Sequence, residues 1–213
     1  NEVPDSLDAE MIDDARPVFE RREKMQLTYT VRNTHRAVGT RFSAEITAKY
    51  GMSTLNEDHV HIRLRGSAGQ SLGAFLCQGI TLEVFGDSND YVGKGLCGGK
   101  IVVRPMVSSP LISQENTIIG NTVLYGATAG QLYAAGQAGE RFAVRNSGAD
   151  VVVEGCGANG CEYMTGGNAV ILGPVGSNFG AGMTGGMAFI LDTKGDFEKM
   201  ANKESIVWQR LDS

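Results

Sequence analysis

Short apolar runs that each follow a glycine recur through most of this chain. The glycines that precede six of these runs lie 20, 31, 18, 19 and 19 residues apart, and they are Gly79, Gly99, Gly130, Gly148, Gly167 and Gly186. The runs are rich in β-branched residues, which favour strands. A strand-rich period of about 19 residues is typical of stacked β repeats, because two-helix repeats need about 30 residues or more.

The length of the repeat predicts the architecture. A unit of this size holds about two or three short strands with turns between them, and it cannot bury its apolar face alone. Stacking would pair the backbone of each unit with its neighbours and fill the interior with alternate side chains. We therefore predict an all-β fold, a right-handed parallel β-helix (a single-stranded solenoid) of about six or seven coils, with short helical or extended N- and C-terminal caps.

The one long step in the repeat and the first 50 residues depart from this pattern. The step of 31 residues predicts an inserted loop over Pro105–Asn116. Near the N-terminus we predict a helix over Leu7–Ala15 that stops before Pro17, a strand over Met25–Arg32 and a helix over Thr40–Tyr50. The chain then divides into an N-terminal extension that packs on or caps the solenoid, the β-helix, and a C-terminal capping segment, at residues 1–55, 56–194 and 195–213.

Composition and charge argue against two kinds of partner. The net charge is −5 and no basic block is present, which disfavours nucleic acid because phosphate contacts need clustered Lys and Arg. No apolar stretch reaches the roughly 18 residues that suggest a membrane-spanning helix, so we expect no membrane partner. The chain begins at Asn1 without a signal peptide, and we expect a domain excised from a longer cytoplasmic protein.

The four cysteines do not predict a metal centre. Cys77, Cys97, Cys156 and Cys161 form no Cys-x-x-Cys pair, and no histidine lies near the last two. We expect reduced thiols packed as small apolar side chains, as in a cytosolic protein. No cofactor is therefore expected in this domain.

Three stretches match the Gly-x-Gly-x-x-Gly pattern of dinucleotide-binding loops, at residues 93–98, 155–160 and 180–185. A nucleotide loop would open a helix, whereas strand-forming residues follow the first and third stretches. The recurrence favours tight corners in a repeat. The structural glycine motif predicted here comprises Gly93, Gly95, Gly98, Gly99, Gly180, Gly182, Gly185 and Gly186.

Other candidate groups are sparse. His59 and His61 lie two apart beside Glu57 and Asp58, but no third ligand is placed for a metal. No nucleophile signature is present, and no row of acidic residues follows the strands as a β-helix carbohydrate enzyme would need, so catalytic residues are predicted to be absent. The segment that carries His35 and two arginines could meet an acidic partner or form a local ion-pair cluster, and both interpretations stay open.

Long runs of the chain resemble a known family. The segments at residues 34–41, 63–71, 86–96, 136–148 and 154–167 closely resemble the C-terminal GXGXG domain of the bacterial glutamate synthase large subunit. The resemblance implies an enzyme that makes two glutamates from glutamine, 2-oxoglutarate and a reductant. It also implies an amidotransferase domain, a synthase domain with FMN and an iron–sulfur cluster, and a β-helix domain that binds neither cofactor.

The resemblance therefore implies a non-catalytic domain that holds the amidotransferase and synthase domains in register for ammonia channelling. Its implied partners are those two domains and a small NADPH-oxidising subunit, while the electron donor, NADPH or ferredoxin, stays open. The predicted interdomain contacts are His35, Arg36, Arg41, Arg63 and Arg65. Two alternatives remain: a stand-alone GXGXG subunit of the methylamine–glutamate methyltransferase or formylmethanofuran dehydrogenase type, and a β-helix carbohydrate-active enzyme.

Overall fold

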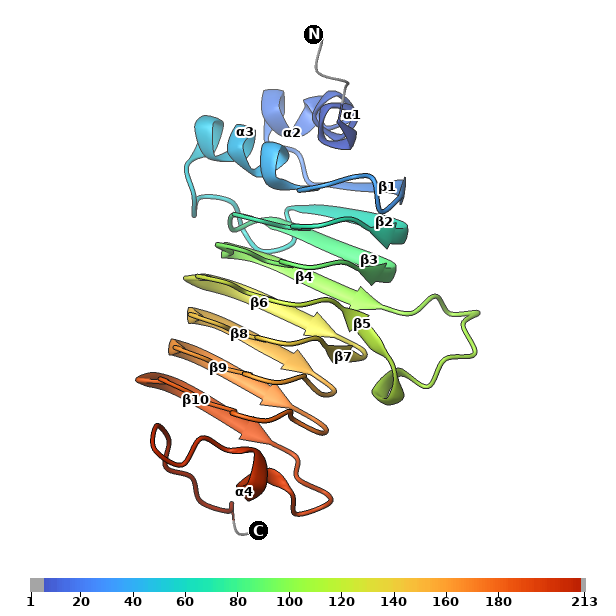
Figure 1. The fold of residues 1–213 in the computed structure, drawn as a ribbon. Helices are drawn as coiled ribbons and strands as arrows, with labels where there is room; N and C mark the ends of the chain where they lie inside the picture. Colours follow the sequence, from blue (N-terminus) through green and yellow to red (C-terminus); the bar gives the residue numbers. More distant parts are fainter. Residues whose placement is uncertain (1–5, 212–213) are drawn as a thin grey trace, which may run out of the picture.

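The strands that the structure describes belong to one parallel sheet (Figure 1). The structure is a computed structural model that describes residues 6–211. The main path of the sheet runs through eight strands in chain order: β1 (Met25–Val31), β2 (Val60–Ala68), β3 (Ile80–Ser88), β4 (Cys97–Arg104), β6 (Ala129–Ala134), β8 (Ser147–Val153), β9 (Thr165–Ile171) and β10 (Gly185–Ile190). Two short strands lie off this path, β5 (Thr117–Ile119) and β7 (Gln137–Ala138), and they pair with each other.

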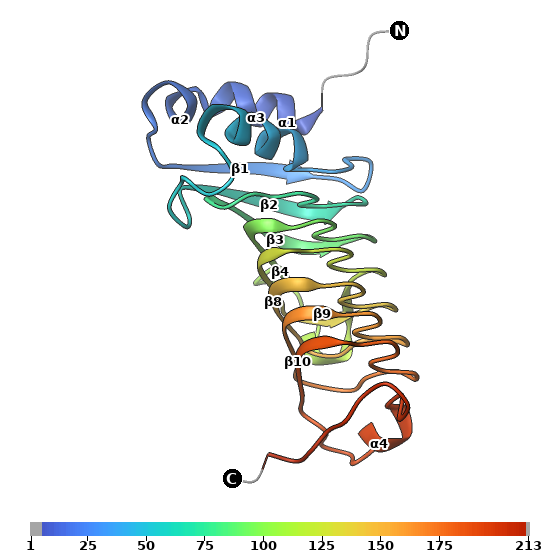
Figure 2. The same ribbon diagram turned by 90° about the vertical axis from the view of Figure 1, so that its left-hand side faces the viewer.

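Equivalent residues of successive units stack in columns. Ile62 lies opposite Leu82, and Leu82 lies opposite Ile101, so the same face of each strand points inward. Figure 2 shows the strands along one side of the stack and the looped return segments along the other. Apolar side chains fill the space between these two walls, and the buried residues form one continuous cluster from Met11 to Phe179. Burying each large aliphatic side chain contributes about 1.5–3 kcal/mol.

The return segments have an unusual backbone. In the unit after β3, the alternate residues Tyr91, Gly93 and Gly95 all have a φ between +62° and +67°. Their N–H groups bond to neighbouring units on both sides, since Tyr91 donates to the carbonyl of Asn121 (2.9 Å) and Gly93 donates to that of Leu72 (2.9 Å). The returns therefore stack through backbone hydrogen bonds without being strands.

The predicted all-β parallel β-helix is wrong as a fold class. The chain is of mixed α and β class, because helices cover the first strand. One of them, α3 (Thr40–Tyr50), follows β1 and precedes β2 along the chain. The main-path strands form a single parallel sheet, and a unit generally adds one strand to it where we expected two or three. The physical reason is the return backbone, because residues with positive φ on alternate positions cannot adopt the extended conformation of a strand.

The N-terminal helices are α1 (Leu7–Asp14), α2 (Arg16–Arg21) and α3. Both helices and the strand predicted for this region are confirmed, the first helix as Leu7–Asp14. Pro17 was misinterpreted as a stop signal, because it lies in the first turn of a further helix, α2, where proline is tolerated. The buried carboxylate of Asp8 accepts hydrogen bonds from the N–H groups of Gly39 (2.9 Å) and Phe42 (2.9 Å), which joins α1 to the start of α3. Burial raises the pKa of Asp8, and these hydrogen bonds oppose the rise.

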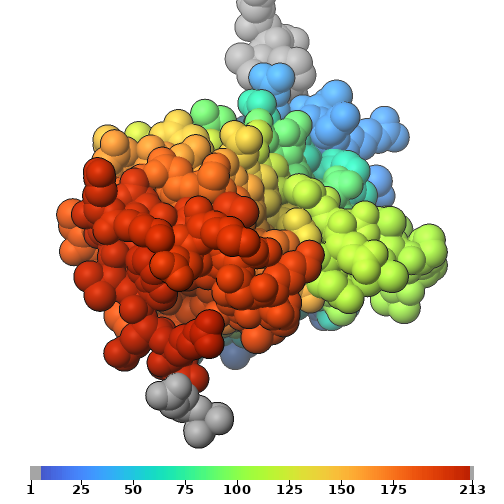
Figure 3. Space-filling model, turned by 60° about the horizontal axis from the view of Figure 1, so that its bottom comes forward, coloured from blue at the N-terminus to red at the C-terminus, as the bar shows by residue number. Residues whose placement is uncertain are grey.

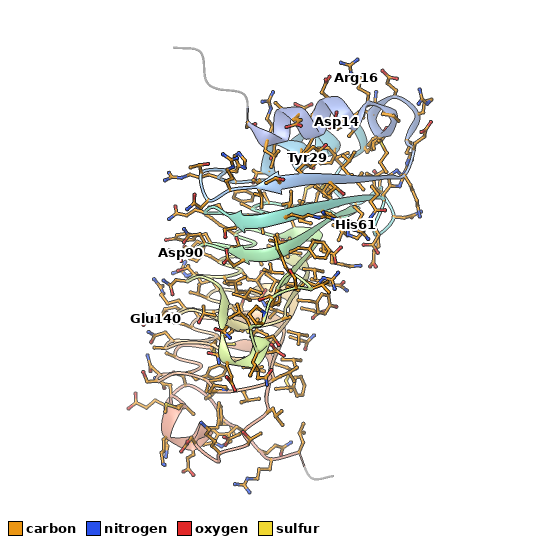
Figure 4. The ribbon with its side chains drawn as sticks, turned by 90° about the vertical axis from the view of Figure 1, so that its right-hand side faces the viewer. Asp14, Arg16, Tyr29, His61, Asp90 and Glu140 are labelled. Atoms are coloured by element: carbon orange, nitrogen blue, oxygen red, sulfur yellow. The ribbon has the colours of Figure 1, made fainter. Side chains whose placement is uncertain are left out.

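A second contact joins the helices to the sheet. The hydroxyl of Tyr29 on β1 donates to Asp14 on α1 (2.8 Å), and Figure 4 labels both residues. Burial and this hydrogen bond raise the pKa of Tyr29, so the phenol stays protonated. The helical layer is thus fixed on the sheet by polar contacts as well as by its apolar core. The domain boundaries at residues 55/56 and 194/195 stay predictions.

The insertion expected after the second predicted strand of the repeat is present. Residues 105–116 leave the stack at the end of β4, include the short 3₁₀ helix η1 (Ser113–Glu115), and return at β5. Figure 3 shows this segment, in yellow-green, standing out from the side of the body. At the far end of the stack, the short helix α4 (Phe197–Met200) packs its Phe197 ring edge-on against Phe179, with 5.6 Å between centroids.

Candidate functional site

The outer face of the sheet carries a charged cluster at β2 to β4, consisting of His61, Arg63, Glu83 and Arg104. Glu83 lies at its centre, with a side chain that is 12% exposed. Its carboxylate lies 2.8 Å from His61 Nε2, 3.0 Å from Arg104 Nη2 and 3.5 Å from Arg63 Nε. Arg104 also lies over the ring of Phe85, 4.4 Å from its centroid. One carboxylate thus orients two guanidinium groups on the sheet surface.

Toward the other end of the stack, one part of the same face is apolar. Val152 on β8 lies opposite Tyr133 on β6, and Val170 on β9 lies opposite both Val152 and Phe189 on β10. Leu172 and Leu191 follow two residues after Val170 and Phe189 and are exposed, as is Met187. We call this set the apolar strip: Tyr133, Val152, Val170, Leu172, Met187, Phe189 and Leu191.

Sequence reasoning missed the apolar strip, although a signal was present. Ala169 to Leu172 and Ala188 to Leu191 are apolar at every position, without the polar alternation of a strand that faces water. Continuous apolar runs are typical of parallel strands covered on both faces. We interpreted these runs only as interior-facing strands, and so overlooked their outward side chains.

The predicted glycine motif is distributed over two places. Gly93, Gly95, Gly180 and Gly182 lie in return segments with φ between +62° and +75°. Gly98, Gly99, Gly185 and Gly186 lie at the starts of β4 and β10. The strands β4 and β10 include Gly98–Gly99 and Gly185–Gly186, so these glycines lead into strands. The assignment of the whole set as a structural motif stays a prediction.

Positive φ alone does not explain the glycines of the returns. Arg145 and Tyr163 have φ of 54° at positions equivalent to Gly95 in their own units. What distinguishes Gly95 and Gly182 is an aromatic ring of the preceding unit: a Cβ would lie 2.4 Å from Phe75 Cε1 at the first and 2.3 Å from Tyr163 Cδ1 at the second. Glycine at these positions makes room for a ring that lies across the stack.

The five predicted interdomain residues do not come together as one site. Arg63 takes part in the charged cluster, and Arg65 is exposed two residues further along β2. His35 uses its Nδ1 to accept a hydrogen bond from the N–H of Arg32 (3.1 Å), while Arg36 and Arg41 are exposed at the start of the α3 region. Within residues 6–211, His35, Arg36 and Arg41 form no ion pair, so the local ion-pair interpretation of that segment is not supported.

A polar groove of about 240 Å³ follows the start of the strands. At one end, Asp58 accepts a hydrogen bond from Thr81 and forms an ion pair with Lys100 (3.1 Å). The hydrogen bond from Thr81 and then the charge of Lys100 lower the pKa of Asp58. Further along, Asn168 donates to Asp150 (2.8 Å). These contacts pair the polar groups with one another.

The side chains described in residues 6–211 offer no group of three or more His, Cys, Asp or Glu that could hold a metal ion. They therefore do not fit an iron–sulfur cluster.

Burial raises the pKa of the Cys156 thiol to about 12 and raises the pKa of the Cys161 thiol well above its usual range, and the nearby Cys156 adds to the rise at Cys161. His59 is buried, and its Nε2 finds no hydrogen-bond partner among the described residues. None of the helices in this part of the chain has both the length and the apolar character to cross a membrane.

Comparison with known proteins gives consistent matches. A family model described as "GXGXG motif" matches residues 8–213. The chain is 69% identical over 212 residues to the glutamate synthase [NADPH] large chain of Azospirillum brasilense, which covers 100% of this chain and 14% of that protein. It is 49% identical over 215 residues to the Bacillus subtilis large chain, again 100% of this chain and 14% of the relative. Ferredoxin-dependent glutamate synthase 2 of Synechocystis is 54% identical over 184 residues, 86% of this chain and 12% of the relative.

Proposed function

Because this chain belongs to the GXGXG family, whose model matches residues 8–213, we propose that it is a non-catalytic structural domain of a glutamate synthase large chain. It spans 14% of the length of the bacterial large chains that it matches. In this proposal it holds an amidotransferase domain and an FMN-binding synthase domain in register within one cytoplasmic polypeptide. A small NADPH-oxidising subunit is a further proposed partner.

The observation that carries the proposal is the filled, continuously bonded stack. The inward residues of the strands are buried and apolar from Val60 to Ile171, and the returns hydrogen-bond to the units on both sides. The interior therefore has no place for a substrate, while the backbone bonding makes the body stiff along its length. Such a body suits the task of fixing a distance between two other domains.

The relatives add a second support. Chains named for NADPH, NADH and ferredoxin are 69%, 50% and 54% identical to this one over the aligned segments. The sequence of a segment that contacted the electron donor would be expected to differ between enzymes that use different donors. The similarity across three named donors supports a role in a step that these enzymes share, such as the transfer of ammonia from the amidotransferase site to the synthase site.

We propose that His35, Arg36 and Arg41 on the N-terminal side, and Arg63 and Arg65 on β2, contact the adjoining domains. The exposed arginines of this set are suited to bidentate hydrogen bonds with carboxylates across an interface. In the full-length large chain, the double variant Arg36→Gln/Arg41→Gln should lower the yield of glutamate per glutamine hydrolysed. The measurement is the ratio of the two amounts in one reaction.

The matched control replaces two exposed arginines of the same helical layer that already have partners in this chain. Arg16 pairs with Asp13, and Arg21 pairs with Glu23. The variant Arg16→Gln/Arg21→Gln should keep the wild-type ratio. An unchanged ratio in the Arg36/Arg41 variant, with the control also unchanged, would remove these contacts from the proposal.

A further inference from the structure

The outer face of the sheet changes character along the stack. One column of outward residues runs by register from Arg63 through Glu83, Val102 and Tyr133. It continues into Val152, Val170 and Phe189 of the apolar strip. This column is therefore continuous from strand to strand, with the charged pair Arg63 and Glu83 at one end and apolar side chains at the other.

Several large side chains of the apolar strip are exposed to solvent. Met187 is 56% exposed, Leu191 54% and Leu172 46%, and they lie on or directly after the adjacent strands β9 and β10. Parallel sheets in proteins nearly always have both faces covered, and a continuous exposed apolar patch of this kind marks an interaction site. The return segments cover only the inner face, so the outer face needs a covering that lies outside residues 6–211.

A second copy of this chain is a poor covering. In a two-fold symmetric dimer the same surface patch of both copies forms the contact, so that if residue i of one copy contacts residue j of the other, residue j of the first also contacts residue i of the second. An axis along the stack would place the arginines of one charged cluster against those of the other, and an axis across the middle of the stack would bury Arg63, Arg65 and Arg104 against the apolar strip. An axis across the apolar strip alone would leave the charged half of the face uncovered. The first arrangement brings like charges together, and the second desolvates three guanidinium groups that have one carboxylate, Glu83, among them.

The covering must therefore differ from this chain in charge pattern. Arg63, Arg65 and Arg104 outnumber the single carboxylate of Glu83, so a complementary surface is acidic at that end and apolar at the other. The bacterial relatives carry this segment within a polypeptide of which it is 14%, and linkage in one chain gives a high effective concentration. A permanent, largely apolar contact fits such a linked domain better than a transient partner.

We propose that the outer face of the sheet packs against an adjoining domain of the same glutamate synthase large chain, through a surface that is acidic opposite Arg63, Arg65 and Arg104 and apolar opposite the apolar strip. This inference rests on the proposed function and adds to it the face that is used and the chemistry of the surface that covers it. The contact is permanent, and it fixes the orientation of the stack as well as its position.

Two natural methionines test the proposal without any substitution. Met187 lies in the apolar strip, and Met52, which is 51% exposed, lies in the loop after α3. In the full-length large chain treated with hydrogen peroxide, peptide mass spectrometry should show Met187 oxidised at least about fivefold more slowly than Met52, because oxidation follows exposure. Equal rates would overturn the proposal. So would a protection that disappears on dilution, because the covering would then be a second molecule.

A charge reversal tests the cationic end. Arg65→Glu in the full-length chain should raise the oxidation rate of Met187 several-fold, while Arg16→Glu on the helical layer should leave it unchanged. An unchanged rate in Arg65→Glu would overturn the acidic part of the proposed surface. The ratio of glutamate formed to glutamine hydrolysed, measured on the same samples, separates the covering of the outer face from the proposed contacts of Arg36 and Arg41. If Met187 is protected but the Arg36/Arg41 variant keeps the wild-type ratio, only the contacts of Arg36 and Arg41 are contradicted.

Discussion

The ring of Phe75 lies where a side chain at Gly95 would have to go, since a Cβ built there falls 2.4 Å from Phe75 Cε1. The two residues belong to successive return segments, and the N–H of Phe75 donates to the carbonyl of Lys94 (2.8 Å) just before the glycine. The glycine is thus fixed by a neighbour from another unit. Tyr163 and Gly182 repeat the arrangement near the other end of the stack.

We predict that Gly95→Ala lowers the free energy of unfolding by about 2–5 kcal/mol. About 1–2 kcal/mol comes from the left-handed backbone, and the remainder comes from the displaced ring, at about 1–3 kcal/mol for overpacking. Urea unfolding followed by circular dichroism measures the change. Adding Phe75→Ala should restore part of the loss.

The control is Gly126→Ala, because Gly126 has nearly the same φ (65° against 62°) and nothing within 4 Å of its Cβ position. The Gly126→Ala variant should lose only the part of the stability that comes from the left-handed backbone conformation. If the Gly95 and Gly126 variants lost the same stability, the ring would not be the reason for glycine at position 95.

Glu83 should contribute more to the stability of the fold than an exposed carboxylate does. We predict that Glu83→Gln lowers stability by about 1–3 kcal/mol, because it leaves His61, Arg63 and Arg104 without the group that they share. Glu198→Gln, which breaks an exposed pair with Lys203, should change stability by less than about 0.5 kcal/mol. Thermal unfolding at low and high salt compares the two. Equal small effects would mean that the charged cluster is only a surface pairing.

Asp58 gives a pH dependence of known sign. Its pKa is lowered in the folded state by Thr81 and Lys100, so its contribution to stability is present above the ordinary value of 3.8 and is lost as the pH falls through the lower folded pKa. The group is exposed, so solvent screening limits the effect to about 0.2–1 kcal/mol. Asp58→Asn should therefore be less stable than the wild type at pH 7 and equal to it near pH 2. A constant difference over this range would contradict the assignment.

The thiols should react in a fixed order. Cys97 is partly exposed, whereas Cys156 and Cys161 are buried and have pKa values far above 8. Since the thiolate is the reactive form, Cys97 should be labelled first by an aromatic disulfide reagent at pH 8, and its own raised pKa should make even that reaction slow. Cys156 and Cys161 should react only in denaturant. Fast labelling of either in native buffer would show that this part of the stack opens readily.

The apolar periodicity predicted the strands but not the fold class. Val151–Val153 and Ile80–Val84 are strands, and Thr40–Tyr50 is the predicted helix, because each has a local pattern that burial reinforces. The returns could not be predicted, since residues such as Arg141 and Arg145 hold positive φ only because neighbouring units bond to their backbone. Such a conformation has no local sequence signature.

The candidate site was predicted less well than the strands. Arg63 was chosen for its place in a cluster of arginines, and it does lie beside Glu83, a residue 20 positions away that no spacing rule connects to it. The outward residues of the apolar strip carry a visible pattern, but a run such as Ala169–Leu172 does not say which side chains face inward. That information comes from the register between strands.

In the proposed function, the stack sets the distance and orientation between two other sites. Asn168 occupies the register position of Asp150 in the next strand, so deleting residues 150–167 and joining Ala149 to Asn168 removes one unit while keeping the columns aligned. The stack becomes shorter by about 4.8 Å, one strand spacing.

The most direct measurement is the amount of glutamate formed per glutamine hydrolysed by the full-length large chain that carries this deletion. We expect that glutamine hydrolysis and synthesis from added ammonia both persist, while the glutamine-dependent yield falls because ammonia escapes. A folded variant that keeps the wild-type yield would contradict it.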